Sequence, residues 1–382
     1  MNVQKICIIG DGLAGLTAAV ILGQENIKID FYVGSKKLKK TTNDNRTTAI
    51  SENSYQFIKK KLNLKNKNLF WPCKEINLFF ENKKKIKNFL KFKEKKKIIM
   101  HIFKNKDLKK SLRKQILIKK NIKVLKENVT EVDYENSSVV IKKNKFFYDL
   151  IILCIGNNSK LYNEITQGRS IEKNYKEIAL TTNIKHNQKI NSVSQFFLKE
   201  GPLAILPFGK NIFSVVWSVS SSFFKENKKN IKKILNAQIK VLLNNSKIRN
   251  IDRIQSFPIY LNLKTKYFKK NILILGDGLH SIHPLAGQGF NLILRDIKKL
   301  QELISSNLKL GLLFKNSFLL KDFYETRKPE NIIIGLGINM TNIFFKDNRY
   351  FFHIKKTILN NVNNFGFIKK ISQSIADRGI FT

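Results

Sequence analysis

The fold of this chain is decided by one stretch, Asn271-Ile-Leu-Ile-Leu-Gly-Asp-Gly-Leu-His-Ser-Ile-His-Pro-Leu-Ala-Gly-Gln-Gly-Phe-Asn-Leu-Ile-Leu-Arg-Asp296. Its first apolar run, Ile272 to Leu275, predicts a short, buried, parallel strand. A Gly-Asp-Gly sequence ends that strand at Gly276, and helical spacing resumes from Asn291. Glycines in a loop before a helix leave backbone N–H groups open to an anion. The stretch therefore predicts a strand, an anion-binding loop and a helix.

Asp277 gives this stretch a candidate binding group. It lies at the carboxyl end of the predicted strand, where open α/β sheets bind their ligands. A carboxylate in that place can accept hydrogen bonds from a ribose or ribityl hydroxyl. The alternative is an ordinary crossover from a strand to a helix, without a ligand.

His280 and His283 lie three residues apart, which raises the alternative of a metal site. A structural zinc site needs about four protein ligands and a catalytic one about three. The chain contains five histidines and three cysteines, and they are scattered along its length. We therefore predict no metal site.

A second glycine-rich stretch, Gly10-Asp-Gly-Leu-Ala-Gly15, lies near the N-terminus between two predicted strands. In a dinucleotide-binding βαβ unit, the first glycine makes the tight turn and the second admits the pyrophosphate. The third glycine lets the helix and the strand pack closely. These roles fall to Gly10, Gly12 and Gly15.

Two residues of this βαβ unit depart from the usual pattern. Val33 stands at the end of the second strand, where an acidic residue usually binds the adenosine ribose. Asp11 places a carboxylate inside the glycine loop, where it either caps the helix or opposes the pyrophosphate.

Together the two stretches resemble the FAD-dependent aromatic hydroxylases, and most closely the branch that hydroxylates ubiquinone precursors. That branch has a Gly-Asp motif followed by Ala-His-x-x-His-Pro-x-Ala-Gly-Gln-Gly-x-Asn. The matching residues here are Gly276, Asp277, His280, His283, Pro284, Ala286, Gly287, Gln288, Gly289 and Asn291. The resemblance implies an α/β fold, in which a Rossmann-like FAD-binding domain of discontinuous segments carries an inserted antiparallel β-sheet substrate domain.

The resemblance covers nearly the whole chain, so it also implies how the chain divides. The expected segments are 1–75, 98–160 and 265–340 for the FAD-binding domain, 76–97 and 161–264 for the substrate-binding sheet, and 341–382 for a C-terminal helical segment. Phenylalanines beside Lys and Arg at 342–358 favour either an amphipathic, membrane-facing helix or an end cap on the core.

The cofactor-binding residues follow from the resemblance alone. It implies that FAD contacts Gly10, Gly12, Gly15, Arg46, Lys106, Gly276, Asp277, Pro284, Gly287, Gln288, Gly289 and Asn291. Arg46 would lie against the flavin, the alternative being a surface arginine at a helix start. Lys106 takes the place of an arginine near the pyrophosphate, in a helix predicted from Phe103 to Leu117. A lysine keeps the charge but loses the bidentate fork.

Pro207 and Trp217 are candidates for the substrate side, again by resemblance. The alternative reading is a turn proline and a core tryptophan. No catalytic residue is assigned, because flavin chemistry needs no protein nucleophile and the chain shows no Ser-His-Asp or Cys-His signature.

A third motif of the family, linked to both FAD and NAD(P)H, is altered in this chain. Gly156, Ser159 and Leu161 match it, whereas Ile155 replaces its aspartate and Tyr162 its arginine. The resemblance as a whole implies a monooxygenase that uses NAD(P)H and O2 to hydroxylate the ring of a polyprenylated phenol. The altered motif motivates an alternative, an accessory flavin-binding subunit without catalysis.

The formal net charge is +43 and the isoelectric point is near 10.1. The lysines recur along the whole chain, which indicates a solvated surface rather than one designed patch. No recognition motif supports nucleic acid as a partner. The sum of charge favours peripheral association with anionic lipid, at about 1 kcal/mol per suitably placed basic residue.

The remaining features place the protein in a reducing compartment. Cys7 and Cys154 lie in apolar runs, where buried free thiols are expected. Met1 leads almost directly into a strand, so we expect no signal peptide. No run of about 20 apolar residues predicts a transmembrane helix. We expect a cytoplasmic protein on the inner face of the membrane, with subunits of a ubiquinone-biosynthesis complex as further candidate partners.

Overall fold

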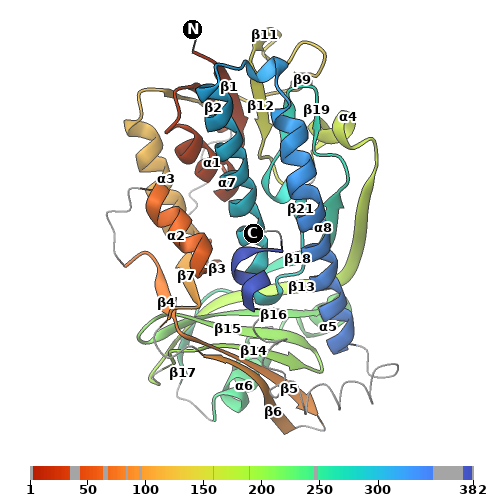
Figure 1. Ribbon diagram of the computed structural model, residues 1–382. Coiled ribbons are helices and arrows are strands. Elements are labelled where there is room, and N and C mark those ends of the chain that lie inside the picture. The colour runs from red at the N-terminus through yellow and green to blue at the C-terminus, as the bar shows by residue number, and fades with distance from the viewer. Residues whose placement is uncertain are drawn as a thin grey trace.

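The computed structural model describes residues 3–34, 44–62, 68–82, 85–93, 97–157, 159–188, 190–244, 248–346 and 373–380. Two sheets dominate it. In Figure 1 the smaller, parallel sheet and its helices form the upper part, and the larger, antiparallel sheet forms the lower part. One long helix, α8 (Leu319–Lys346), runs along the side of both parts.

The upper sheet has six strands in the order β19-β20-β12-β1-β2-β8, and all neighbours are parallel except β19 and β20. Its central strands are buried on both faces, as continuous apolar runs such as Leu-Ile-Ile-Leu in β12 require. The strands are β1 Lys5–Ile9, β2 Lys28–Tyr32, β8 Ile122–Leu125, β12 Leu150–Leu153, β19 Phe268–Lys269 and β20 Ile272–Ile274.

Helices cover this sheet. Helix α1 is almost wholly buried, and Ala18 and Ala19 are small enough to let it approach the sheet closely. Further helices lie around the sheet and along the small sheet next to it. Their bounds are α1 Leu13–Leu22, α2 Glu52–Lys61, α3 Asn105–Ile118, α4 Asn163–Thr166 and α7 Gln288–Lys309.

The lower sheet has nine strands, in the order β21-β18-β13-β16-β15-β14-β5-β6, with β17 beside β13. Its neighbours are antiparallel except β14 and β5. Helices α5 (Ser221–Asn227) and α6 (Ile231–Leu242) belong to this part of the molecule. The strands are β5 Glu75–Asn82, β6 Lys85–Lys93, β13 Ser170–His186, β14 Val193–Leu198, β15 Gly201–Gly209, β16 Ile212–Ser220, β17 Ile248–Ile251, β18 Gln255–Lys264 and β21 His280–Ser281.

Two small sheets complete the fold. One joins the parts and has the order β3-β7-β4, and the other has the order β11-β10-β9. Their strands are β3 Thr47–Ser51, β4 Trp71–Cys73, β7 Met100–Lys104, β9 Glu131–Asp133, β10 Ser138–Ile141 and β11 Asn144–Phe147.

The predicted fold class is confirmed: a mostly parallel sheet with helices carries a large antiparallel sheet. The strand expected at Ile272 to Leu275 is β20, and it pairs in parallel with β12. The exact domain boundaries stay a prediction. Of the C-terminal segment expected at 341–382, residues 341–346 continue α8, and 347–372 lie outside the described residues. Within the described ranges, no helix is long and apolar enough to cross a bilayer.

Candidate functional site

A cavity of about 2430 Å³ lies between the two large sheets. Segments far apart in the sequence meet there: the N-terminal glycine loop, strand β3, the loop before α7, the inner faces of β13, β15 and β18, and helix α8. Of the predicted cofactor-binding residues, those that line it are Gly10, Gly12, Arg46, Asp277, Pro284, Gly287, Gln288, Gly289 and Asn291. The candidate site is thus built from both glycine-rich stretches together.

The N-terminal loop needs its glycines for different reasons. Gly10 has φ +112°, and a Cβ there would lie 2.3 Å from the carbonyl oxygen of Cys154. A Cβ on Gly15 would lie 1.9 Å from the carbonyl oxygen of Gly10. Gly12 meets no atom within 4 Å and is the N-cap of α1, without a side-chain cap. Gly10 and Gly15 therefore allow close packing, whereas Gly12 leaves the start of the helix open to the cavity.

Asp11 does not cap α1. Its carboxylate accepts a hydrogen bond from Nη2 of Arg113 on α3, at 2.9 Å. The ion pair offsets the negative charge that Asp11 brings into the glycine loop. Sequence reasoning missed Arg113, because the contact joins two elements about a hundred residues apart.

Helix α3 shows that Lys106 is the wrong lysine for this site. Its side chain does not line the cavity, whereas Asn105 and Lys109 do. The helix begins at Asn105, so a residue four positions later shares its face, and Lys106 lies about 100° round the axis. Lys109 Nζ lies 3.7 Å from Asp44 Oδ2, so Lys109 and not Lys106 is the lysine of this pair at the cavity wall.

Arg46 immediately precedes β3 and lines the cavity. Its guanidinium donates to both carboxylate oxygens of Asp44, each at 2.8 Å, and lies 4.9 Å from the ring centroid of Phe257. Hydrogen bonding to Asp44 raises the pKa of Arg46, against the effect of burial. Arg46 is therefore a fixed positive charge at the junction of the two sheets.

Asp277 projects into the cavity, where its side chain is exposed. The surrounding protein still raises the pKa of this carboxyl, while the charges of His280, Arg46 and Lys109 act in the opposite direction. Gly276 does not line the cavity. It has φ +81° and packs against Ala14 of α1, so it sets the direction of the strand end that presents Asp277.

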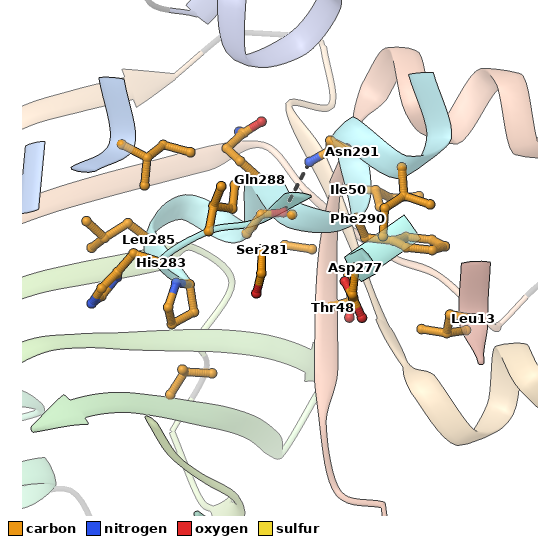
Figure 2. Close-up of a pocket in the computed structure, with 18 of the residues that line it drawn as sticks. Leu13, Thr48, Ile50, Asp277, Ser281, His283, Leu285, Gln288, Phe290 and Asn291 are labelled. Carbon is orange, nitrogen blue, oxygen red and sulfur yellow. Dashed lines mark hydrogen bonds between the residues drawn. The ribbon is translucent and has the colours of Figure 1, made fainter. Parts of the chain in front are cut away.

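The loop before α7 is held by Asn291, which is buried (Figure 2). Its Oδ1 accepts a hydrogen bond from the backbone N–H of Ser51 at 2.9 Å. Its Nδ2 donates to the carbonyl oxygen of Gly287 at 3.2 Å, the dashed line in Figure 2. Gly287 itself has φ +66° and lies against Ala49 of β3. These contacts fix the loop on β3 and keep Gln288 and Gly289 at the cavity wall.

Pro207 and Trp217 do not line the cavity, so the prediction that they face the substrate is wrong. Their neighbours Leu206 and Val216 line it instead. Alternate side chains of a strand point to opposite faces. Trp217 is fully buried beneath the sheet, in a cluster with Leu235 of α6.

The altered third motif follows β12. Ile155 lines the cavity, and Tyr162 is buried next to it. The hydroxyl of Tyr162 donates to the carbonyl oxygen of Gly156 at 2.7 Å. Burial raises the pKa of Tyr162, so the hydroxyl stays neutral. This loop is closed by a hydrogen bond between two neutral groups.

A C-terminal segment, residues 373–380, also reaches the cavity, and sequence reasoning missed it. Ser51 Oγ donates to the backbone oxygen of Asp377 at 3.0 Å, and Asp377 Oδ1 accepts from Asn53 N at 2.9 Å. Arg295 of α7 donates to the carbonyl oxygen of Ala376 at 3.0 Å. No local sequence pattern in this segment predicts these contacts.

Comparison with known proteins agrees with this architecture. The family model of squalene epoxidase matches residues 212–374. Ubiquinone biosynthesis monooxygenase COQ6 of Dictyostelium discoideum is 26% identical over 264 residues, which are 56% of this chain and 53% of that protein. The 3-demethoxyubiquinol 3-hydroxylase of Escherichia coli is 28% identical over 164 residues, 42% of each chain. This chain thus spans about half the length of the curated relatives that it matches.

A solved structure shares the fold. The protein pqsL, a probable FAD-dependent monooxygenase from Pseudomonas aeruginosa, superposes with a TM-score of 0.73 at 14% sequence identity. The match covers 93% of this chain and 100% of that one. By sequence this chain is similar to ubiquinone biosynthesis monooxygenases and hydroxylases, and by fold it is similar to a probable FAD-dependent monooxygenase.

Proposed function

We propose that this protein is an FAD-dependent monooxygenase that hydroxylates the aromatic ring of a polyprenylated phenol, a precursor of ubiquinone. One observation carries the proposal. Two glycine loops that lie far apart in the sequence line the same cavity of about 2430 Å³, one with Gly10 and Gly12 and the other with Gly287 and Gly289. Two separate anion-binding loops around one cavity suit one long dinucleotide.

The residues present suit FAD. The open N-terminus of α1 at Gly12 would take the pyrophosphate, with Lys109 and Arg113 as the nearby positive charges. Asp277 would accept hydrogen bonds from sugar hydroxyls. Arg46 and the backbone of Gly287 to Gly289 would lie toward the flavin ring.

When bound and reduced by NAD(P)H, FAD supplies the activation of dioxygen that side chains cannot provide. The chain's own contribution is to place the phenol ring and to exclude water. The rest of the cavity suits this task and a long isoprenoid chain, because its walls there are mainly apolar. They include Leu78, Leu90, Phe197, Leu206, Val216, Ile338 and Phe345.

Peripheral association with the inner face of the membrane belongs to the same proposal, since polyprenylated phenols reside in bilayers. Ile333, Met340 and Ile343 of α8 line the cavity and are exposed at the same time. Apolar side chains at an open side of a substrate cavity, on a protein of net charge +43, suit contact with an anionic lipid surface. Other subunits of a ubiquinone-biosynthesis complex would meet the protein at this surface.

A second candidate, an accessory flavin-binding subunit without catalysis, rests on the third motif. Ile155 offers no hydrogen bond to a cofactor, and Tyr162 uses its hydroxyl on Gly156. The pyrophosphate loop and Asp277 are unaffected by this change. Both candidate functions therefore include FAD binding, and only the monooxygenase would hydroxylate a phenol.

The binding of FAD is tested by the Asp277→Ala variant. We expect the purified wild-type protein to show the visible absorbance of oxidised flavin, and the variant to retain clearly less. Loss of charge-assisted hydrogen bonds costs about 1.5–3 kcal/mol each, enough to weaken binding at least tenfold. Trp217→Phe, which changes a buried residue outside the cavity, is the control and should retain flavin. Full flavin occupancy in Asp277→Ala would contradict the assignment.

A further inference from the structure

His283 is a buried imidazole on the cavity wall that the proposed function does not yet use. Its side chain has no exposed surface, and it lines the cavity. Figure 2 shows it beside Leu285 at one end of the loop, with Asp277 and Phe290 toward the other end. It therefore lies on the substrate side of the loop, away from the residues assigned to the nucleotide.

The contact that His283 makes determines which of its nitrogens carries the proton. Nε2 of His283 lies 3.0 Å from Oε2 of Glu177. An ionised carboxylate only accepts hydrogen bonds, so Nε2 must donate. In the neutral imidazole, Nδ1 is then an acceptor with a free lone pair. Among the described residues, Nδ1 has no hydrogen-bond partner.

Glu177 is held in place as an ionised group. Burial by itself raises the pKa of its carboxyl, but hydrogen bonds from His283 and Lys346 reverse this, and the pKa is lowered. Lys346, at the end of α8, bonds the second oxygen, Oε1. Glu177 itself is almost fully buried. A buried carboxylate behind an imidazole stabilises the imidazolium that forms when the outer nitrogen takes a proton.

An irregularity in β13 lies directly before Glu177. The register of β13 against β18 shifts between Asn174 and Glu177, and Lys176 in the bulge has φ +52°. The backbone N–H of Lys176 donates to Asn174 Oδ1 at 2.9 Å, which stabilises the bulge. Bulges re-aim side chains next to functional sites. Tyr175 and Lys176 are both without a register partner on β18 at this point, and Tyr175 and Glu177 both contact His283.

Tyr175 completes the surroundings of the imidazole. Its ring meets His283 edge-on, with centroids 5.3 Å apart, and its hydroxyl donates to Asn339 Oδ1 at 3.1 Å. Its hydroxyl is therefore engaged elsewhere. The titratable or charged groups that face His283 within the described ranges are Tyr175, Glu177 and, through Glu177, Lys346.

We infer that His283 is the general base that takes the proton from the ring hydroxyl of the phenol, an inference that rests on the proposed function. The O–H bond of the phenol breaks, and an N–H bond forms at Nδ1. The oxygen keeps the electron pair, which makes the ring carbons more nucleophilic toward the incoming hydroxyl. The hydroxylated carbon then loses its hydrogen as a proton, which ends in the water formed from the second oxygen atom of dioxygen. As the ring regains aromaticity, the imidazolium returns its proton to the phenol oxygen. Glu177 stays ionised throughout and is a positioning residue.

The test uses a prenylated 4-nitrophenol, because its phenolate absorbs visible light and its neutral form does not. Difference spectra of the probe bound to the purified protein are recorded across pH. We expect wild-type protein to raise the acid dissociation constant of the bound probe at least about tenfold over that in buffer, and His283→Gln to abolish this increase. Turnover of a prenylated phenol should fall about 10²–10⁴-fold in His283→Gln, the usual contribution of a general base.

A matched control is His101→Gln. His101 is also buried and lies 2.7 Å from a carboxylate oxygen, Glu52 Oε2, but it does not line the cavity. This variant should ionise the probe as the wild type does. If His283→Gln fails to fold, Glu177→Gln tests the same proposal, because it keeps the imidazole and removes the charge that stabilises its protonated form.

Unchanged ionisation of the bound probe in His283→Gln, or in Glu177→Gln when only that variant folds, would overturn the inference. The spectral readout needs neither flavin, dioxygen nor turnover. It can therefore fail while flavin binding and hydroxylation succeed, and that result would leave the proposed function standing. If the wild-type protein does not bind the probe, both the inference and the proposed substrate class are wrong.

Discussion

At the scale of single residues, the shape of the site depends on its glycines as much as on the side chains that line it. Gly10 and Gly15 leave no room for a Cβ, because backbone oxygens lie 2.3 Å and 1.9 Å from where it would be. Tyr162 shows the reverse case. It fills the space beside Gly278 and closes its loop through the carbonyl oxygen of Gly156. Tyr162 therefore closes this loop without a charged group.

The first prediction concerns reduction of the flavin and uses Ile155→Asp. Ile155 lines the cavity but cannot hydrogen-bond to a cofactor. We expect slow reduction of the wild-type flavin by NADH or NADPH, and faster reduction in the variant, because the carboxylate restores a polar contact near the flavin. FAD binding should differ little, since the other two motifs are intact. Stopped-flow absorbance measures both rates. Rapid reduction in the wild type, with no gain in the variant, would show that the altered motif is neutral.

At the scale of elements, helices α7 and α8 are joined by a buried network of charges. Asp296 of α7 accepts from Arg327 Nε at 2.7 Å and lies 2.6 Å from His280 Nε2. Arg327 also pairs with Glu330, which pairs with Arg295 of α7. All five side chains are buried or nearly so. The network fixes the helix that follows the cavity loop against the helix that forms the cavity's open side.

The second prediction is that Asp296→Asn destabilises the fold by about 3–5 kcal/mol, because it leaves Arg327 buried without its charged partner. Burial alone raises the pKa of Asp296, but Arg327 and His280 lower it below the usual 3.8. Its stabilising effect is therefore full above about pH 4 and lost as pH falls through the lower folded-state pKa. The variant should lack this part of the acid transition.

Urea unfolding at neutral and acidic pH measures both effects. The control is Glu325→Gln on the same helix, which breaks an exposed pair with Lys321 at 3.9 Å. Such pairs contribute about 0.3–0.5 kcal/mol, so this variant should behave like the wild type. Equal stability of the two variants would mean that the network does not hold the helices together.

Elements also explain which site residues the sequence could predict. The glycines were predictable because a tight turn and a close approach leave no other choice at those positions. Lys109 was missed in favour of Lys106, because the residue at which α3 begins determines which of its side chains face the cavity. Likewise, the alternation of side chains along a strand places Pro207 and Trp217 on the face of the sheet opposite to the cavity. The pairing of His283 with Glu177 joins residues 106 positions apart, and no local sequence pattern predicts it.

At the scale of the whole molecule, the two sheets enclose one cavity that is polar at the glycine loops and apolar toward α8. Exposed Ile333, Met340 and Ile343 lie on its open side. The chain as a whole carries a formal net charge of +43. The molecule as a whole thus presents an apolar opening on a basic surface.

The third prediction is that the protein binds anionic vesicles through both features. Sedimentation should show stronger binding to anionic than to neutral vesicles at low salt, and added salt should weaken it. Serine at Ile333, Met340 and Ile343 should reduce binding. Serine at Leu117 and Ile118, which are exposed on α3 away from the cavity, should not. Equal binding to neutral and anionic vesicles would exclude an electrostatic contribution to membrane binding. Equal effects of the two sets of serine substitutions would exclude the exposed residues of α8 as the membrane-binding face.

The central claim, that this protein oxygenates a prenylated phenol ring, is tested most directly by one mass-spectrometric measurement. The bound flavin is reduced by light, which bypasses NAD(P)H, and is then mixed with isotopically labelled dioxygen and a polyprenylated phenol. We predict a product that carries one labelled oxygen on the ring. If the flavin is reoxidised and the phenol is recovered without any labelled product, the claim is contradicted and the accessory flavin-binding subunit becomes the better account.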